Sequence, residues 1–143
     1  HAQAHLQLRF VVGTDIARLR EHVQTHLRTH GFGDIEVSEP VVMRATRLDP
    51  DNAWVRFVMA SIARSTGIAP ALLPNLGGSL PNDVFAEGLG LPTVWVPHSY
   101  PACSQHAPDE HLLKPVARQA LQLMTGLFWD LGEQAAALPL RRA

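Results

Sequence analysis

Two kinds of apolar pattern follow one another in the first forty residues. Between positions 5 and 12 apolar side chains fall on every second position, with Arg9 among the polar ones. This alternation predicts a strand with one buried face. From 16 to 27 the apolar residues recur every three to four positions, which predicts a helix that ends near Gly31. A second short strand is predicted over 34–37, so the region forms a strand-helix-strand unit.

The middle of the chain contains a connector and a second helix. Residues 40–50 show no period and include two prolines, which predicts an extended connector between two structural regions. Beyond it, Asp51 or Asn52 can cap a helix that ends at Gly67. The apolar side of this helix is predicted to consist of Trp54, Val55, Val58, Met59 and Ile62.

The second half of the chain alternates between expected strands and helices. Strands are predicted over 70–76 and 91–97, with a helix over 81–87 between them. A long helix is predicted over 114–131. Its buried residues are expected to be Val116, Ala120, Leu121, Met124, Leu127, Phe128 and Leu131. This alternating order predicts an α/β fold, with the first forty residues as a separate smaller unit.

Composition and charge narrow the classes of partner. The 143 residues are 46% hydrophobic and 17% charged, with a formal net charge of -1. This balance gives no electrostatic reason to expect binding to nucleic acid or to an anionic membrane. No apolar run has the length of a membrane span, and the first residues do not resemble a signal peptide. The single Cys103 agrees with a reducing compartment, so we expect a cytoplasmic protein.

Histidines at four-residue spacing occur on the first predicted helix. His22, His26 and His30 would line one helical face, as the ligands of a metal site do. The apolar stripe lies about 100° around the helix, so these histidines fall at its edge or on the solvent side. Because zinc sites usually add an acidic or thiolate ligand from elsewhere, the sequence favours exposed histidines that bind metal adventitiously.

Two features could bind a carboxylate or another anion. Gly77, Gly78 and Ser79 precede a predicted helix, where exposed amides and a hydroxyl can converge on an anion. The alternative is an ordinary tight turn with Ser79 as helix cap, and the sequence alone favours it. Arg9 could likewise be a bidentate carboxylate clamp or simply a surface cation, and the sequence favours the second interpretation.

The loop over 98–111 is the richest in residues of the kinds that bind zinc. These are His98, Cys103, His106, Asp109, Glu110 and His111. His106 lies in mid-loop with no apolar period to bury it, which favours a functional role. Cys103 and His106 form a C-x-x-H without a second half-site, so a closed structural zinc site is disfavoured. A Cys-His nucleophilic pair also lacks an orienting residue, and we interpret Cys103 as an ordinary thiol.

Three motifs, in this order and spacing, carry a family resemblance. LQLRF, GGSLPNDVFAEGLGLPTVWVP and SQHAPDEH resemble the C-terminal half of the di-zinc amidohydrolases and exopeptidases. That family includes aminoacylase, acetylornithine deacetylase, succinyl-diaminopimelate desuccinylase and the glutamate carboxypeptidases. The resemblance spans about 5–131, and the GGS-helix-strand-HAPDE succession is its most specific part.

The resemblance implies a division of the chain and a role for each motif. Residues 1–39 would be the second half of an α+β lid or dimerisation domain, and 40–143 the C-terminal part of a zinc-peptidase-like catalytic α/β domain. Arg9 and the loop of Gly77, Gly78 and Ser79 would contact the substrate carboxylate. His106 would be the last zinc ligand, and His98 would lie beside the metal ligands.

The other catalytic residues of that family have no counterpart here. A His-x-Asp motif, a bridging aspartate and a Glu-Glu pair precede the lid in the family. We therefore expect a fragment of a metallohydrolase that is inactive alone, because one ligand cannot hold two zinc ions. Cobalt or manganese are alternatives to zinc.

The resemblance also implies the partners. The substrate would be a small acylated amino acid or a short peptide, cleaved at an amide bond next to its carboxylate-bearing group. The missing N-terminal half would be a second partner, and exposed apolar patches would favour a homo-oligomer. The alternative function is a non-catalytic binding or dimerisation module.

Overall fold

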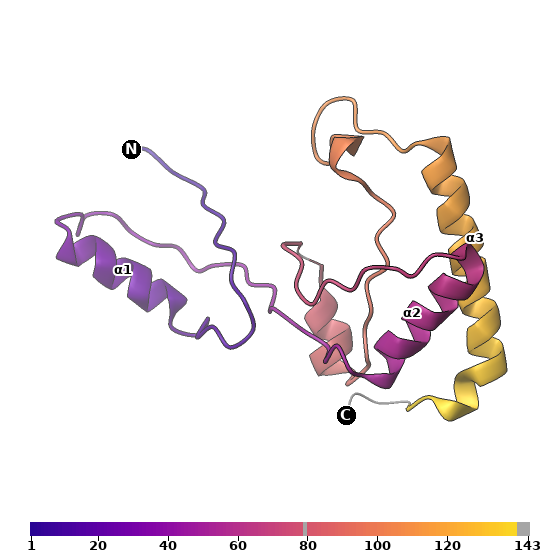
Figure 1. The fold of residues 1–143 in the computed structure, drawn as a ribbon. Helices are drawn as coiled ribbons and strands as arrows, with labels where there is room; N and C mark the ends of the chain where they lie inside the picture. Colours follow the sequence, from indigo (N-terminus) through magenta and orange to yellow (C-terminus); the bar gives the residue numbers. More distant parts are fainter. Residues whose placement is uncertain (79, 140–143) are drawn as a thin grey trace.

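Helices joined by long irregular segments make up the molecule (Figure 1). The computed structural model describes residues 1–78 and 80–139. The three α-helices are α1 (Leu19–Thr29), α2 (Ala53–Thr66) and α3 (Lys114–Gln134). Three shorter turns are η1 (Val84–Gly88), η2 (Pro101–Cys103) and η3 (Ala135–Ala137). The helices predicted over 16–27, 52–67 and 114–131 are therefore confirmed.

Helix α2 begins and ends as its terminal residues dictate. The Oδ1 atom of Asn52 accepts a hydrogen bond from the backbone amide of Trp54 at 2.9 Å, which satisfies one of the unpaired donors of the first turn. Gly67 closes the helix with φ of 72°, a left-handed conformation that glycine adopts without steric cost. The buried face of α2 consists of Val55, Phe57, Val58 and Ser61.

The core of the molecule lies where α2 crosses α3 (Figure 1). Gly126 of α3 faces Ser65 of α2 so closely that no side chain fits between them. At the same crossing, the Arg64 guanidinium donates to a carboxylate oxygen of Asp130 at 2.7 Å. The hydroxyl of the fully buried Ser61 and the charge of Arg64 both lower the pKa of Asp130 below its usual range. Small residues and one ion pair thus fix the contact between the helices.

The buried stripe of α3 differs in part from the expected one. Leu123 is buried, whereas Leu121 is 72% exposed and Phe128 is 66% exposed. Only the side of α3 that contacts α2 can be buried by it, and Leu121 and Phe128 lie outside that side. The prediction that both are buried is wrong, because the 3.6-residue period locates an apolar face without saying what covers it.

The predicted α/β fold is wrong. Segments 5–12, 34–37, 70–76 and 91–97 form no strand, and no sheet occurs in the part of the chain that the structure describes. A strand is stable only when a neighbouring strand takes up its backbone hydrogen bonds and another layer covers its apolar face. Neither condition holds for 5–12, where the Leu6 side chain is 93% exposed. The predictions of a catalytic α/β domain and of half of an α+β lid domain are therefore wrong as well.

Side chains of α1 replace a partner strand at 35–37. The Gln24 amide donates through Nε2 to the carbonyl of Ile35 at 2.8 Å and accepts through Oε1 from the amide of Val37 at 3.1 Å. This two-point contact matches what a neighbouring strand would offer. Arg20 adds a bond to the Val37 carbonyl at 2.9 Å and an ion pair with Glu39 at 3.2 Å. The segment is held to a helix and stays outside any sheet.

Helix α1 and its flanking segments lie at the opposite end of the molecule from α2 and α3 (Figure 1). Among the described residues of α1, none is buried. The division into 1–39 and 40–143 stays a prediction. The connector over 40–50 is irregular, and the helix predicted over 81–87 winds as the short π-helical turn η1. Across 1–78 and 80–139, no helix combines the length and apolar character needed to cross a bilayer.

The close contact between α2 and α3 gives a stability prediction. In Gly126→Ala, the new Cβ would overlap the Ser65 hydroxyl and lie 3.2 Å from Ser65 Cβ. We expect the free energy of unfolding to fall by about 1–3 kcal/mol, as overpacking usually costs. Urea denaturation followed by far-UV circular dichroism measures this change.

Gly132→Ala is the matched control, because Gly132 lies on the same helix and a Cβ there meets nothing within 4 Å. This variant should be unchanged or more stable by up to about 1 kcal/mol, since alanine favours the helix. Equal destabilisation of the two variants would contradict the close-contact explanation.

Candidate functional site

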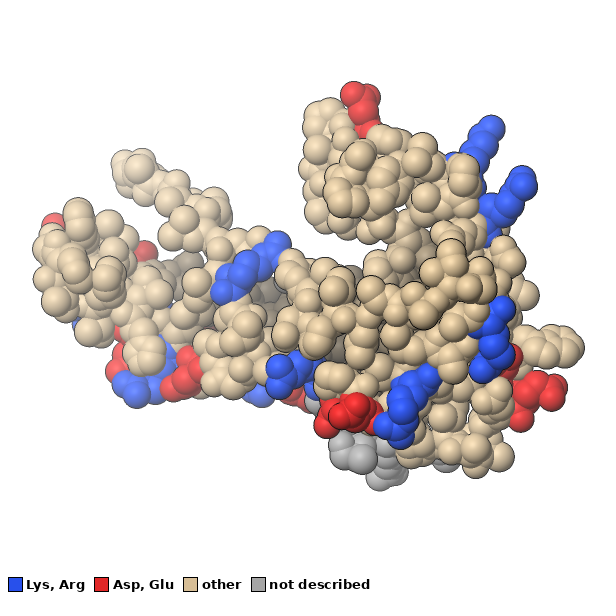
Figure 2. Space-filling model, viewed as in Figure 1, with Lys and Arg blue, Asp and Glu red and all other residues tan. Residues whose placement is uncertain are grey.

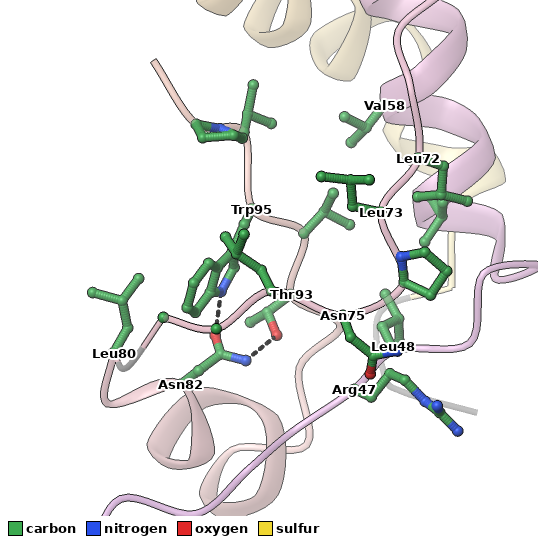
Figure 3. Close-up of a pocket in the computed structure, with 18 of the residues that line it drawn as sticks. Arg47, Leu48, Val58, Leu72, Leu73, Asn75, Leu80, Asn82, Thr93 and Trp95 are labelled. Atoms are coloured by element: carbon green, nitrogen blue, oxygen red, sulfur yellow. Dashed lines mark hydrogen bonds between the residues drawn. The ribbon is translucent and has the colours of Figure 1, made fainter. Parts of the chain in front are cut away.

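A cavity of about 740 Å³ is lined by the N-terminal segment and by helices α2 and α3. Its walls come from segments far apart in the sequence. They are 8–12, 43–48, part of α2, 70–78, 93–100 and part of α3. Leu72, Leu73 and Val58 face Trp95 and Thr93 across this space (Figure 3). The cavity is mainly apolar with a few polar groups at its rim, which is the usual character of a small-molecule site.

Arg9 and the Gly77 carbonyl both line this cavity and are joined by a hydrogen bond. The Nη1 atom of Arg9 donates to that oxygen at 2.8 Å, and its Nη2 atom donates to the Gln7 side-chain oxygen at 3.1 Å. The first of these bonds joins residues 68 positions apart. The sequence places Arg9 and Gly77 in one site only through the family resemblance, and the structure brings them into direct contact.

The Trp95 indole packs against Gly78. A Cβ added to Gly78 would lie only 3.1 Å from the Trp95 ring, so glycine is what allows this approach. Gly77, by contrast, has open space where a side chain would project. One side of the glycine pair is therefore supported by an aromatic ring, while the other is open for a ligand to approach the backbone. Ser79, the third predicted residue of this loop, lies outside the described residues.

Asn82 joins three segments around the cavity. Its Nδ2 atom donates to the hydroxyls of Thr46 at 2.6 Å and Thr93 at 2.9 Å, and its Oδ1 atom accepts from the Trp95 indole at 3.4 Å. Figure 3 shows the bonds to Thr93 and Trp95. Sequence analysis missed Asn82 and Trp95, because their partners are distant in the chain. Asn82 falls at the start of the helix predicted over 81–87, and Trp95 falls within the strand predicted over 91–97.

His98 lies where two cavities adjoin. It lines the large cavity together with Arg9, Gly77 and Gly78, and it also lines a second cavity of about 420 Å³. The other walls of the second cavity are Ser99, Cys103, Glu110, His111 and Leu112. Four of the predicted site residues thus share one cavity, and His98 connects that cavity with the histidine-rich loop.

His106 stands apart from both cavities on an exposed loop. Ser104, His106 and Asp109 all adopt left-handed backbone conformations, with φ of 57°, 62° and 62°. Residues other than glycine rarely adopt this conformation, and those that do often mark functional loops. The His106 amide donates to a carboxylate oxygen of Glu110 at 3.2 Å, which helps to hold the turn. The loop presents the His106 ring to solvent.

Cys103 is buried at the base of the same loop. Its exposed fraction is 5%, and its carbonyl accepts from the backbone amide of His111 at 3.0 Å. The His111 ring donates through Nδ1 to the Asp109 carbonyl at 2.8 Å and meets the Tyr100 ring edge-on at a centroid distance of 5.9 Å. These contacts are those of a loop anchor, which agrees with an ordinary thiol at Cys103.

The residues present do not make a complete zinc site. Catalytic zinc needs three protein ligands and a water, and His106 offers one imidazole. Within 1–78 and 80–139, no three His, Cys, Asp or Glu side chains gather closely enough to bind a metal ion. Any zinc held by His106 would need ligands from another segment or another chain.

Charge on the surface is mixed in sign. Lys and Arg lie interspersed with Asp and Glu along the lower edge of the face in Figure 2. Such mixing matches the formal net charge of -1 and produces little long-range field. The expectation of no nucleic-acid partner stays a prediction.

Comparison of the chain with protein-family models, curated proteins and solved structures finds no match. The family resemblance described above therefore stays a prediction.

The bonds of Asn82 predict how the cavity wall is held. Asn82→Ala removes its bonds to Thr46, Thr93 and Trp95 and leaves their polar groups without this partner. We expect the free energy of unfolding to fall by about 1–3 kcal/mol in urea denaturation. Thr46→Val is the matched control, because it removes only one of the three bonds and should cost less. An equal loss in the two variants would contradict a joining role for Asn82.

Proposed function

We propose that this chain is the carboxylate-binding part of a zinc-dependent metallohydrolase. The enzyme would cleave an amide or peptide bond next to the carboxylate-bearing group of a small acylated amino acid or short peptide. The observation that carries the proposal is the contact of Arg9 with Gly77 at the wall of the large cavity. The two residues are 68 positions apart in the sequence, so the fold and not the local chain brings them together.

The position of Arg9 suits a carboxylate ligand. Two of its acceptors, the Gly77 carbonyl and the Gln7 amide oxygen, are neutral. A carboxylate is a stronger acceptor for a guanidinium, and it can take two parallel N–H donors at once. A substrate carboxylate entering the cavity can therefore replace these neutral acceptors. The open backbone at Gly77 leaves room for it.

The apolar walls of the cavity suit the remainder of such a ligand. Leu72, Leu73 and Val58 line the side opposite Trp95. An acyl chain or an apolar amino-acid side chain would bury its surface there, at roughly 25 cal/mol per Å² of area removed from water. A polar rim with an apolar interior thus fits a molecule with one charged end, which is the substrate class proposed.

His106 would supply one metal ligand from its exposed loop. The remaining ligands and the general base would come from a segment outside this chain, with the His-x-Asp motif, aspartate and Glu-Glu pair of the resembling family. Zinc, or cobalt or manganese in its place, would polarise the scissile carbonyl when bound. This chain by itself would bind the carboxylate and not hydrolyse the amide bond.

Exposed apolar residues on α3 fit a chain that works with a partner. Leu121, Phe128 and Trp129 are 72%, 66% and 73% exposed, and such surface favours association. The segment that carries the other catalytic residues, or a second copy of the chain, would cover this surface. The single cysteine favours a cytoplasmic location. The same surface would serve a non-catalytic binding module, which the two tests below distinguish from the enzyme.

The carboxylate contact is tested by ligand binding to this chain. N-acetyl-L-methionine should bind more tightly than N-acetyl-L-methionine amide, because only the acid offers a charged acceptor to Arg9. In Arg9→Gln we expect the acid to bind about 10- to 100-fold more weakly, as loss of a charge-assisted hydrogen bond implies. Isothermal titration calorimetry measures both ligands.

Arg118→Gln is the control, because Arg118 is exposed on α3 and does not line the cavity. Its affinity for the acid should equal that of the unchanged chain. Equal affinity for acid and amide, or full affinity in Arg9→Gln, would remove the carboxylate assignment.

The metal role of His106 is tested in the assembled enzyme, formed by this chain and the segment that carries the other ligands. His106→Ala should lower zinc occupancy, measured by elemental mass spectrometry, together with the rate of amide hydrolysis. Loss of a metal ligand predicts at least a tenfold fall in metal affinity. Full occupancy and activity in this variant would contradict the assignment. Carboxylate binding without hydrolysis by any such assembly would favour the binding module.

A further inference from the structure

The exposed face of α1 carries histidines that the proposed function leaves unused. His26 lies in the last turn of α1 and His30 is its C-cap residue. Helix α1 lies at the far end of the molecule from α2 and α3 (Figure 1). The other side of α1 uses Arg20 and Gln24 to hold residues 35–39. The histidine face is therefore separate from the contacts that keep α1 in place.

The two imidazole rings are already close together. Their centroids are 4.1 Å apart and their planes are inclined by 32°. Two imidazoles that bind one metal ion place their nitrogen atoms about 2.0–2.1 Å from it. Residues at i and i+4 on a helix have the spacing for this.

A hydrogen bond fixes the tautomer of His30. Its Nδ1 atom lies 2.8 Å from the carbonyl oxygen of His26. A carbonyl oxygen only accepts, so Nδ1 must carry the hydrogen and the neutral ring keeps its lone pair on Nε2. Histidines that bind metals usually make this kind of bond through the other nitrogen, because it orients the ring and increases its basicity. His30 therefore keeps Nε2 as the nitrogen that could bind a metal ion, which the sequence spacing alone does not show.

We propose that His26 and His30 form a two-histidine site for a late first-row divalent cation. Imidazole nitrogen suits Cu²⁺, Ni²⁺ and Zn²⁺, whereas Mg²⁺ and Ca²⁺ need oxygen ligands. Affinity should be greatest for Cu²⁺, as the usual order of these metals predicts. Water completes the coordination, since the described part of the chain provides no third ligand close by.

A bound ion would link two turns of α1, in addition to the bonds that hold this helix to residues 35–39. α1 has eleven residues, none of them buried, and its N-cap residue Arg18 makes no side-chain capping bond. Isolated helices of this length are marginal in water. An ion bound to His26 and His30 in the folded helix, and more weakly in the unfolded one, stabilises α1 by mass action. The site therefore couples cation binding to the order of the first part of the chain.

The test is titration of the tag-free chain with chlorides of Cu²⁺, Ni²⁺, Zn²⁺ and Mg²⁺ by isothermal calorimetry. We expect one Cu²⁺ per chain at this site and no measurable binding of Mg²⁺. His26→Gln and His30→Gln should each weaken Cu²⁺ binding at least tenfold, and glutamine keeps the helix propensity high. His22→Gln should weaken it less, because the paired rings are those of His26 and His30.

Two controls separate this site from the other histidines. His5→Gln, outside α1, should leave Cu²⁺ affinity unchanged. His106→Ala should also leave Cu²⁺ affinity unchanged. A loss of metal binding in His106→Ala alone would concern the proposed metallohydrolase and not this site. Paramagnetic broadening by Cu²⁺ in the amide NMR spectrum should be strongest around residues 26–30.

Three results would overturn the proposal. The first is full Cu²⁺ affinity in His30→Gln. The second is an equal loss in every histidine variant, which would indicate adventitious binding over the surface. The third is a loss in His22→Gln as large as that in His30→Gln, which would assign the ion to another pair.

Discussion

The contact between α2 and α3 is the constraint on which the rest of the structure depends. Gly126 lets the α3 backbone approach Ser65, and this approach allows Arg64 to reach Asp130. The Ser61 hydroxyl and Arg64 lower the pKa of Asp130, which favours its charged form where the helices meet. The cavity that we propose as a binding site has these two helices as one wall. Its shape therefore depends on a close helix contact some distance from its polar rim.

Side chains hold the remaining backbone where a sheet was expected. Gln24 bonds to both sides of the peptide segment around residue 36, Arg9 bonds to the Gly77 carbonyl, and Asn82 joins the segments of Thr46 and Thr93. Each contact satisfies a few polar groups, whereas a strand ladder would satisfy a whole row. Extended segments can thus keep defined positions without a sheet, but they leave apolar surface uncovered. The exposed Leu6 side chain shows this directly.

The sequence predicted what depends on local signals. Asn52 and Gly67 mark the ends of α2 because capping and the left-handed closing conformation are properties of a few consecutive residues. The predicted strands failed because alternation at 5–12 reports a tendency that only a partner strand can realise. For the same reason, the joining role of Asn82 could not be found, since its partners lie 36 and 11 positions away. The sequence suggested that Arg9 and Gly77 lie near each other only through the family resemblance, which implies that both contact the substrate carboxylate.

Arg9 also links the proposed site to the position of the N-terminal segment. Its bond to the Gly77 carbonyl ties residues 5–12 to the glycine turn. A carboxylate that binds the guanidinium would compete with the Gly77 carbonyl and weaken the bond between Arg9 and Gly77. The new bond to the carboxylate would be stronger, because a charged acceptor replaces a neutral one. Ligand binding and the position of the N-terminal segment would then be coupled, and by linkage a change that loosens the segment would alter carboxylate affinity. An arginine in this place can thus both bind the ligand and transmit its presence to the part of the chain that carries α1.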